Sequence, residues 1–118
     1  AAEMFLIEAE AKAKSTSFSD IDAATVLFDL IKTRDANYTV STNTGQALID
    51  EILIHRRIEL WGEGFRFLDL KRLNQPLDRT GANHSINLAS GVLEVPVNDP
   101  RWQWVIPRQE LDANDNIN

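Results

Sequence analysis

The feature that most limits how this chain can fold is the helical spacing of its apolar residues, which is clearest between residues 20 and 34. Four of them stand at positions i, i+3, i+4 and i+7 and so share one face of a helix, namely Ala24, Leu27, Phe28 and Ile31. Such a helix is stable only when this face is buried against a partner. We expect the partner to be a helix of about residues 1–14, which are rich in strong helix formers such as Ala, Glu and Lys.

The two predicted helices are separated by the Ser/Thr-rich residues 15–19, and Ser19 or Asp20 can cap the second helix by accepting a hydrogen bond from its free N–H groups. Two helices joined by so short a turn form an antiparallel hairpin of the kind used by TPR-like repeats. A single hairpin does not establish a repeat period, so the TPR-like hypothesis rests on the hairpin alone.

A third helical pattern covers about residues 46–73 and ends before Pro76. The pattern runs through Gly62 and Gly64, and each glycine costs a helix interior up to ~1 kcal/mol relative to alanine. The sequence therefore predicts a long kinked helix, or a break into two helices near Gly62.

The character of the sequence changes after Pro76, where residues 76–107 predict a loop and a small β-hairpin. Two runs alternate between apolar and polar residues, the first through Leu93, Val95 and Val97 and the second through Trp102, Trp104 and Ile106. Residues 110–118 predict a polar tail. The expected fold is mainly α: one unit over residues 1–118 with a TPR-like helical hairpin, a long kinked helix and an irregular C-terminal region containing a small β-hairpin.

Composition excludes several classes of function. The chain has 12 basic and 18 acidic residues and a formal charge of −6, which argues against binding to nucleic acid or to an anionic membrane surface. It has no cysteine, and His55 and His84 have no further ligand at a suitable spacing, so no metal site and no cofactor is predicted. Because it lacks an initiator Met, a signal peptide and a lipid-attachment cysteine, we interpret the sequence as part of a longer protein.

The densest charged segment runs from Arg56 to Arg72 and places opposite charges three or four residues apart, as on a helix. The expected pairs are Glu59 with Arg56, Glu63 with Arg66, and Asp69 with Arg66 or Arg72. A glycosidase-type acid/base pair needs a carboxyl with a raised pKa, whereas a neighbouring arginine favours the ionised form. The spacing thus favours structural ion pairs over catalysis.

The run from Glu59 to Arg72 resembles the signature of the RagB/SusD family, which reads acidic-Leu, then Glu-Gly-x-Arg, then Asp-Leu-x-Arg. The residues that carry this likeness are Glu59, Glu63, Gly64, Arg66, Asp69 and Arg72. Two flanking segments are similar to family segments in the same order: Ala2–Ala11 to the helix before the signature, and Ile106–Leu111 to the closing Ile-Pro-x-x-Glu segment. The resemblance spans nearly the whole chain and matches the C-terminal part of such proteins.

The resemblance implies a lipid-anchored protein at the surface of a bacterial outer membrane. Such a protein binds oligosaccharide or polysaccharide without catalysis and hands it to a SusC-like TonB-dependent transporter. Its contact with the membrane is an N-terminal lipid anchor that this fragment lacks. Two alternatives stay open: a TPR-like protein–protein interaction module without sugar binding, which should show an exposed apolar groove between the first two helices, and a glycoside hydrolase fragment.

Trp102 and Trp104 are the candidate glycan-stacking residues, because an indole face can stack on the C–H face of a sugar while its N–H donates a hydrogen bond. Their spacing of two places them on one face of the predicted strand. The competing interpretation is that both pack over the helices as core residues. Trp61 lies within the signature and is interpreted as structural.

Overall fold

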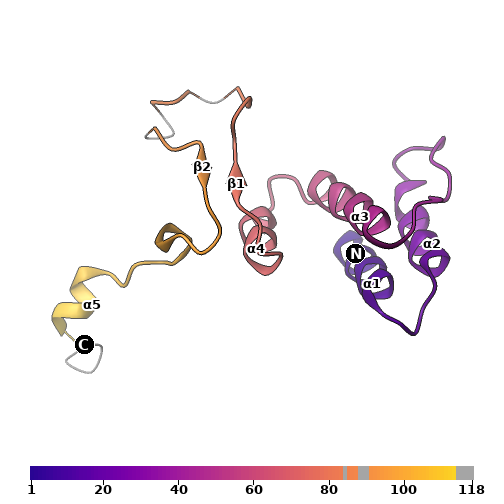
Figure 1. The fold of residues 1–118 in the computed structure, drawn as a ribbon, viewed down its shortest axis with the longest axis horizontal. Coiled ribbons are helices and arrows are strands. Elements are labelled where there is room, and N and C mark those ends of the chain that lie inside the picture. Colours follow the sequence, from indigo (N-terminus) through magenta and orange to yellow (C-terminus); the bar gives the residue numbers. More distant parts are fainter. Residues whose placement is uncertain (84, 88–90, 114–118) are drawn as a thin grey trace. The chain divides into compact units, whose positions relative to one another are not determined.

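The computed structural model describes residues 1–83, 85–87 and 91–113. The chain divides into two compact units, Ala1–Arg66 and residues 67–118, where the sequence predicted one. Each unit has its own apolar cluster, so the two are described separately. Figure 1 labels their elements in chain order.

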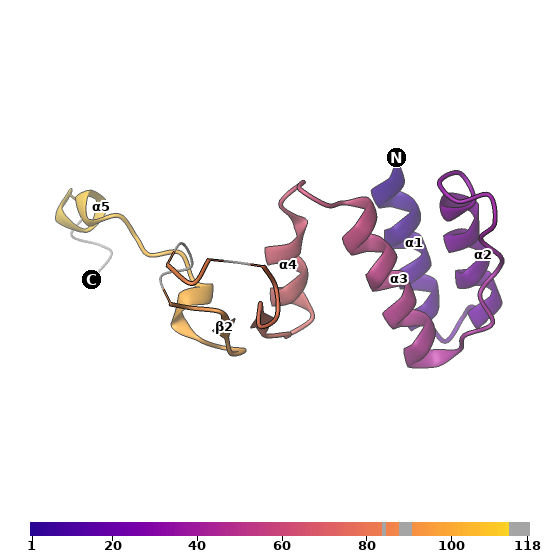
Figure 2. The same cartoon turned by 90° about the horizontal axis from the view of Figure 1, so that it is seen from above.

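The first unit contains α1 (Ala2–Lys14), α2 (Asp20–Ile31) and α3 (Gly45–Glu59). The predicted hairpin is confirmed as α1 and α2, although α2 ends at Ile31 and residues 32–34 form a turn. α1 packs against both other helices, and Figure 2 shows α2 and α3 running opposite to α1. α1 is therefore the central helix of this unit.

Apolar side chains from all three helices form the core of the first unit. Its largest fully buried side chains are Leu6, Leu27, Leu48 and Ile52. Small residues accompany them, since Ala9, Ala23 and Ala24 are at most 1% exposed. Because the distance between packed helices depends on the side chains at the contact, these alanines allow a close approach. The stripe predicted on α2 is confirmed at Ala24, Leu27 and Ile31, whereas Phe28 is only half-buried.

The start of α2 is fixed by two acidic side chains. Ser19 is the N-cap, and the Asp22 carboxylate accepts hydrogen bonds from its backbone N–H at 2.8 Å and its hydroxyl at 2.6 Å. The Asp20 carboxylate accepts instead from the backbone N–H of Gly45, at 3.0 Å. Asp20 thus joins the first turn of α2 to the first residue of α3.

The connection between α2 and α3 is held to α3 by one carboxylate. Glu51 accepts hydrogen bonds from the Tyr38 hydroxyl at 2.7 Å, from Asn43 Nδ2 at 2.8 Å and from the Ser41 hydroxyl. Burial alone would raise the pKa of Glu51, but these donors stabilise the ionised form and lower it. Burial and the bond to Glu51 raise the pKa of Tyr38. The loop is therefore ordered around an ionised glutamate.

The long third helix is broken rather than kinked. α3 ends at Glu59, and α4 (Phe65–Arg72) begins after residues 60–64. Gly62 and Gly64 have φ angles of +80° and +82°, in the left-handed region that glycine adopts without steric cost. Of the two predicted outcomes, the break near Gly62 is thus confirmed.

The second unit combines α4 from Phe67 onward with short elements: β1 (Leu77–Asp78), β2 (Glu94–Val95), the 3-10 helix η1 (Pro100–Trp102) and α5 (Arg108–Ala113). β1 and β2 pair antiparallel, with Leu77 opposite Val95. Leu70, Val95 and Trp102 form the buried cluster. α5 shows that the predicted polar tail begins as a helix, while residues 114–118 lie outside the described part of the chain.

The small antiparallel sheet is confirmed, but the predicted strand pairing is wrong. The segment around Val95 pairs with residues 77–78 and not with residues 102–106. The cause is local, because the Asp99 carboxylate accepts a hydrogen bond from the backbone N–H of Arg101 at 2.9 Å and caps η1. Trp102 therefore lies in a helical turn, and the alternation that predicted a strand is not realised there.

Two isoleucines of α3 test the core of the first unit. Ile52 is 0% exposed and Ile54 is 58% exposed, on the same helix. Ile52→Ala should lower the free energy of unfolding by about 2–5 kcal/mol because it leaves a cavity. Ile54→Ala, the matched control, should change it by less than about 0.5 kcal/mol. Urea unfolding followed by circular dichroism measures both, and equal losses would contradict this assignment of the core.

Candidate functional site

The signature carboxylate Glu59 pairs with an arginine that lies 25 positions away in the sequence. Arg34, in the turn after α2, places Nη2 at 2.6 Å from Glu59 Oε1 and its Nε at 3.2 Å from both carboxylate oxygens. This bidentate contact lowers the pKa of Glu59 and raises that of Arg34. The predicted pairing of Glu59 with Arg56 is therefore wrong.

Arg56 is directed into the first unit instead. Its side chain is 7% exposed, its Nη2 lies 3.6 Å from Glu3 Oε1 of α1, and its guanidinium stands 5.4 Å from the centre of the Phe65 ring. A flat guanidinium suits this position because it can stack on a ring and face a carboxylate together. Arg56 thus connects α3, α1 and the start of α4.

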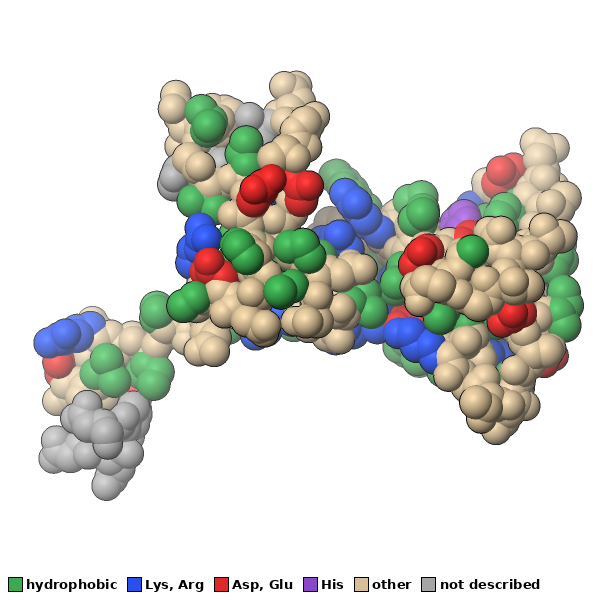
Figure 3. Space-filling view, in the orientation of Figure 1, with side chains coloured by type: hydrophobic (Ala, Val, Ile, Leu, Met, Phe, Trp, Pro, Cys, Tyr) green, Lys and Arg blue, Asp and Glu red, His purple; other side chains and the backbone are tan. Residues whose placement is uncertain are grey.

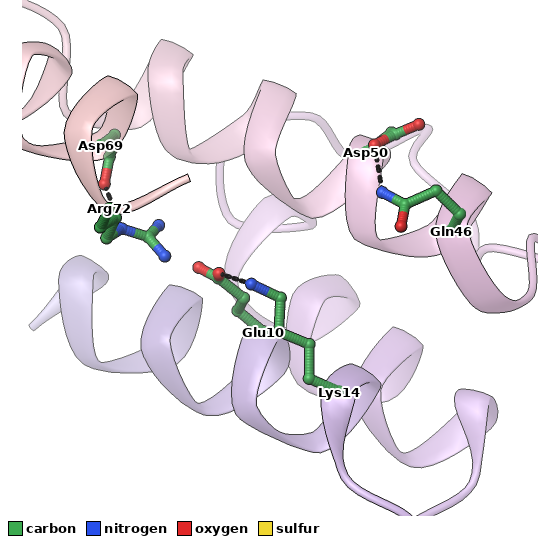
Figure 4. Close-up of polar contacts among 6 residues, drawn as sticks. All are labelled: Glu10, Lys14, Gln46, Asp50, Asp69 and Arg72. Atoms are coloured by element: carbon green, nitrogen blue, oxygen red, sulfur yellow. Dashed lines mark hydrogen bonds and ion pairs between the residues drawn. The ribbon is translucent and has the colours of Figure 1, made fainter. Parts of the chain in front are cut away.

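The signature pair within α4 forms as predicted. Arg72 Nε lies 2.8 Å from Asp69 Oδ1, three residues earlier on the helix, and the Asp69 side chain is 10% exposed (Figure 4). Figure 4 also draws Glu10 with Lys14 at 2.5 Å and Gln46 with Asp50 at 2.7 Å, each one turn apart. Such pairs stabilise the helix that carries them.

The other signature residues lie around the break between α3 and α4. Glu63 and Arg66 are exposed, and Gly64 has the left-handed φ of +82°. A side chain at Gly64 would strain this backbone, even though there is open space for it. The glycine of the signature is thus explained by backbone conformation.

These contacts bear on the catalytic alternative. The arginine beside Glu59 lowers the pKa of that carboxyl, whereas a general acid needs a raised pKa. The Asp69 carboxylate is engaged by Arg72. Neither carboxylate has the environment of a glycosidase-type acid.

The two candidate tryptophans differ in exposure. Trp102 is 9% exposed, and its indole N–H donates to the Pro96 carbonyl at 2.6 Å. Trp104 is 87% exposed in an irregular segment after η1. The expectation that both share one strand face is wrong, because η1 rotates Trp102 inward. Of these two, Trp104 is the one that presents an open indole face.

Phe67 of α4 brings the two tryptophans together, a contact that the sequence did not indicate. Its ring lies 5.6 Å from that of Trp102, at 35°, and 6.2 Å from that of Trp104, at 70°. Lys71, one turn later on α4, places its ammonium 5.4 Å from the centre of the same ring. Phe67, Lys71, Trp102 and Trp104 are called here the aromatic cluster.

A groove of about 210 Å³ adjoins this cluster. It is lined by Leu70, Lys71, Asn74, Gln75, Val97, Asn98, Asp99, Trp102 and Gln103. The amides of Asn74, Gln75, Asn98 and Gln103 can both donate and accept hydrogen bonds, as sugar hydroxyls require of their partners. The groove lining therefore combines the Trp102 indole with groups suited to a polyol.

Asp99 is the acidic side chain of the groove, and its charge is already compensated. The Arg101 guanidinium donates to it twice, from Nε at 2.8 Å and from Nη2 at 2.7 Å. These bonds and the backbone N–H of Arg101 lower the pKa of Asp99 to about 2. Asp99 is thus a structural anion that caps η1, and not a proton donor.

A second surface lies on the first unit, along the side of α3 away from its core. Ile54, Arg57, Ile58 and Trp61 line an open cleft of about 420 Å³ there. Ile58 is 66% exposed and Trp61 is 85% exposed, so Trp61 does not serve as a core residue of this unit. The protein-interaction hypothesis expected an apolar groove between the first two helices, whereas this cleft belongs to α3.

The described residues give no indication of a metal site or of a membrane-spanning helix. Within residues 1–83, 85–87 and 91–113, no group of three His, Asp or Glu side chains could hold a metal ion, and no helix is long and apolar enough to cross a membrane. His55 packs edge-on against the Tyr38 ring at 5.3 Å, and His84 lies outside the described residues. Figure 3 shows acidic, basic and hydrophobic side chains interspersed on the face that it draws.

Comparison with known proteins finds matches to a family model and to solved structures. A family model described as the SusD family matches residues 1–118. The crystal structure of a SusD-like carbohydrate binding protein from Bacteroides vulgatus matches with 32% sequence identity and a TM-score of 0.73. The match covers 98% of this chain and 28% of that one, so the chain spans about a quarter of the length of this similar protein. No curated protein matches.

The pairing of Glu59 with Arg34 predicts a pH-dependent contribution to stability. Glu59→Gln should lower the urea midpoint near neutral pH, by less than Ile52→Ala does, because the Arg34 side chain is 58% exposed and solvent screens the pair. The folded-state pKa of Glu59 is lowered, so its stabilisation is complete above the unfolded-state value of about 4.3 and disappears as the pH falls through the folded-state value.

Urea unfolding of both proteins at a series of pH values measures this effect, and the difference in midpoint should close in acid. Glu63→Gln is the control, because Glu63 is an exposed carboxylate of the same signature and should leave the midpoint unchanged. A difference in urea midpoint that did not shrink as the pH was lowered would argue against the Glu59–Arg34 ion pair.

Proposed function

The chain belongs to the SusD family, and on that premise we propose that it forms the C-terminal portion of a glycan-binding protein in a bacterial outer-membrane polysaccharide-uptake system. The similar protein from Bacteroides vulgatus is described as carbohydrate binding, and it shares 32% of its aligned residues with this chain. Within such a protein, most of this chain acts as scaffold. Glu59 pairs with Arg34 and Asp69 pairs with Arg72, and these internal ion pairs support a structural role.

The aromatic cluster and its groove are the part of this chain proposed to contact sugar. The observation that carries this proposal is the open indole face of Trp104, 87% exposed and held against Phe67. A sugar stacks on such a face through its C–H groups. The groove amides, Asn74 and Gln103 among them, then meet its hydroxyls. Trp102 has its N–H engaged by Pro96, so it supports the floor of the groove and does not donate to ligand.

Capture without catalysis is the proposed mode of action. Glycoside cleavage needs two carboxyls beside one bond, one of them with a raised pKa. Glu59 and Asp69 of the signature and Asp99 of the groove are instead bound by arginines, and the pKa values of Glu59 and Asp99 are lowered. The chain is thus proposed to bind and present an oligosaccharide.

The proposed partner and location are supported by membership of the family and not by a contact in the structure. We propose that the full-length protein is lipid-anchored at the cell surface and works with a SusC-like TonB-dependent transporter. Affinity purification of the full-length protein from outer membranes of the native host tests this. Recovery of a TonB-dependent transporter in stoichiometric amount is the expected result, and its consistent absence from intact membranes would contradict it.

A protein-interaction module without sugar binding is the second candidate, and the cleft on α3 favours it. Ile54, Ile58 and Trp61 expose apolar surface beside the cation of Arg57. The occupant that this surface fits is an amphipathic helix with an apolar stripe and an acidic residue opposite Arg57. Loss of partner binding on Ile58→Asp, combined with no glycan binding by the unchanged protein, would favour this function.

Substitution of each tryptophan tests whether that residue contacts sugar or packs in the core. In the full-length protein, Trp104→Ala should weaken glycan affinity roughly two- to tenfold, the range of one aromatic contact, with less than about 0.5 kcal/mol lost in stability. Trp102→Ala should lower the free energy of unfolding by about 3–5 kcal/mol, because it empties the core of the second unit. Calorimetric titration with plant and host polysaccharides and thermal unfolding measure the two effects.

Unchanged affinity in Trp104→Ala, for a glycan that the parent protein binds, would remove Trp104 from the site. Silence of the parent protein across a broad panel of polysaccharides would contradict the glycan-binding function itself.

A further inference from the structure

One charge of the groove is left without a counter-ion. Lys71 lines the groove, and within the described part of the chain no carboxylate lies at ion-pair distance from its ammonium. Its ammonium lies 5.4 Å from the centre of the Phe67 ring, as a cation–π contact. The neighbouring acid on α4, Asp69, is paired with Arg72. Lys71 is therefore available to an anion from outside.

The acidic side chain of the groove, Asp99, does not supply that anion. Asp99 is held by three hydrogen bonds from Arg101, two from the guanidinium and one from the backbone. With its charge matched by Arg101, Asp99 contributes little net field to the groove. The remaining polar lining consists of neutral amides. The net charge offered to a ligand in this groove is therefore that of Lys71.

The groove is also small. Its volume of about 210 Å³ lies below the roughly 300–1,000 Å³ of sites for drug-sized ligands, so it suits one sugar ring and not an oligosaccharide. Neighbouring sugars of the same chain would lie outside the groove. The exposed Trp104, which contacts the Phe67 ring edge-on, is available to them there. One sugar ring would thus occupy the groove, and a second sugar ring would stack on Trp104.

We propose that the groove selects an acidic sugar, whose anionic group pairs with the Lys71 ammonium while its hydroxyls meet the amides of Asn74, Gln75, Asn98 and Gln103. This inference rests on the proposed glycan-binding function and adds the substrate class. A lysine ammonium is a compact charge that accepts either a carboxylate or a sulfate, so uronic acids and sulfated sugars are both candidates. Phe67 fixes the position of the ammonium by holding it over its ring.

The experiment uses the full-length protein and pairs of ligands that differ in charge alone. Calorimetric titration compares an oligogalacturonide with its methyl ester, and a sulfated galactan oligomer with the neutral one. The expected preference is roughly fivefold for the acidic member of at least one pair, the scale of one exposed ion pair, and it should shrink as salt is raised. The pair that shows the preference identifies the anion as carboxylate or sulfate.

Lys71→Gln should abolish this preference, by lowering affinity for the acidic ligand more than affinity for the neutral one. Lys32→Gln is the matched control, because Lys32 also holds its ammonium over a phenylalanine, Phe28, at 4.8 Å, but lies in the turn after α2 in the first unit, where it pairs with Asp29. It should retain the full preference. Thermal unfolding of both variants checks that the fold is kept.

The outcomes distinguish the two proposals. Equal affinity for the acidic and neutral members of both pairs overturns the acidic-sugar inference and leaves the glycan-binding function standing. A preference that survives Lys71→Gln overturns the role of Lys71. Absence of binding to these ligands and to the broader polysaccharide panel overturns both.

Discussion

The packing of α1 between α2 and α3 is the constraint on which the rest of the first unit depends. Fully burying a large aliphatic side chain contributes about 1.5–3 kcal/mol, and this contact buries Leu6, Leu27, Leu48 and Ile52 completely. Ion pairs at the surface contribute much less. The burial therefore places the helices, and the polar contacts follow from that placement. Arg34 meets Glu59, and Tyr38 meets Glu51, because α2 and α3 are both held against α1.

Local pattern allowed the helices to be predicted, since their signals lie within one or two turns of the chain. The stripe on α2, the cap at Ser19 and the break at Gly62 are of this kind. The partner of Glu59 could not be found in this way. Spacing suggested Arg56, one turn away, but burial turned Arg56 toward Glu3 and Phe65 and left Glu59 to Arg34. Alternation at residues 102–106 failed because the Asp99 cap outweighed it.

The candidate site was predictable only in its two tryptophans, and not in Phe67 or the groove. Trp102 and Trp104 could be named from composition and spacing, but not that one is buried and the other open. The groove joins two turns more than 20 residues apart in sequence, Asn74–Gln75 and Val97–Gln103, and no local pattern connects them. A faint signal exists in Asn74 and Asn98, which adopt left-handed φ angles of +51° and +61°. Asparagine tolerates this conformation better than most residues, and it also supplies an amide to the groove.

The residues that identify the family are therefore different from those proposed to bind sugar. Helix α4 carries members of both groups. Asp69 and Arg72 pair with each other along the helix, and Gly64 supplies the turn that lets the helix begin. Phe67 and Lys71, from the same helix, belong to the aromatic cluster. A helix whose ends are fixed by structural residues can hold its remaining side chains in place while their identity varies with the ligand. Rigid presentation of this kind reduces the entropy lost on binding, which matters most for a site that gains little from each sugar contact.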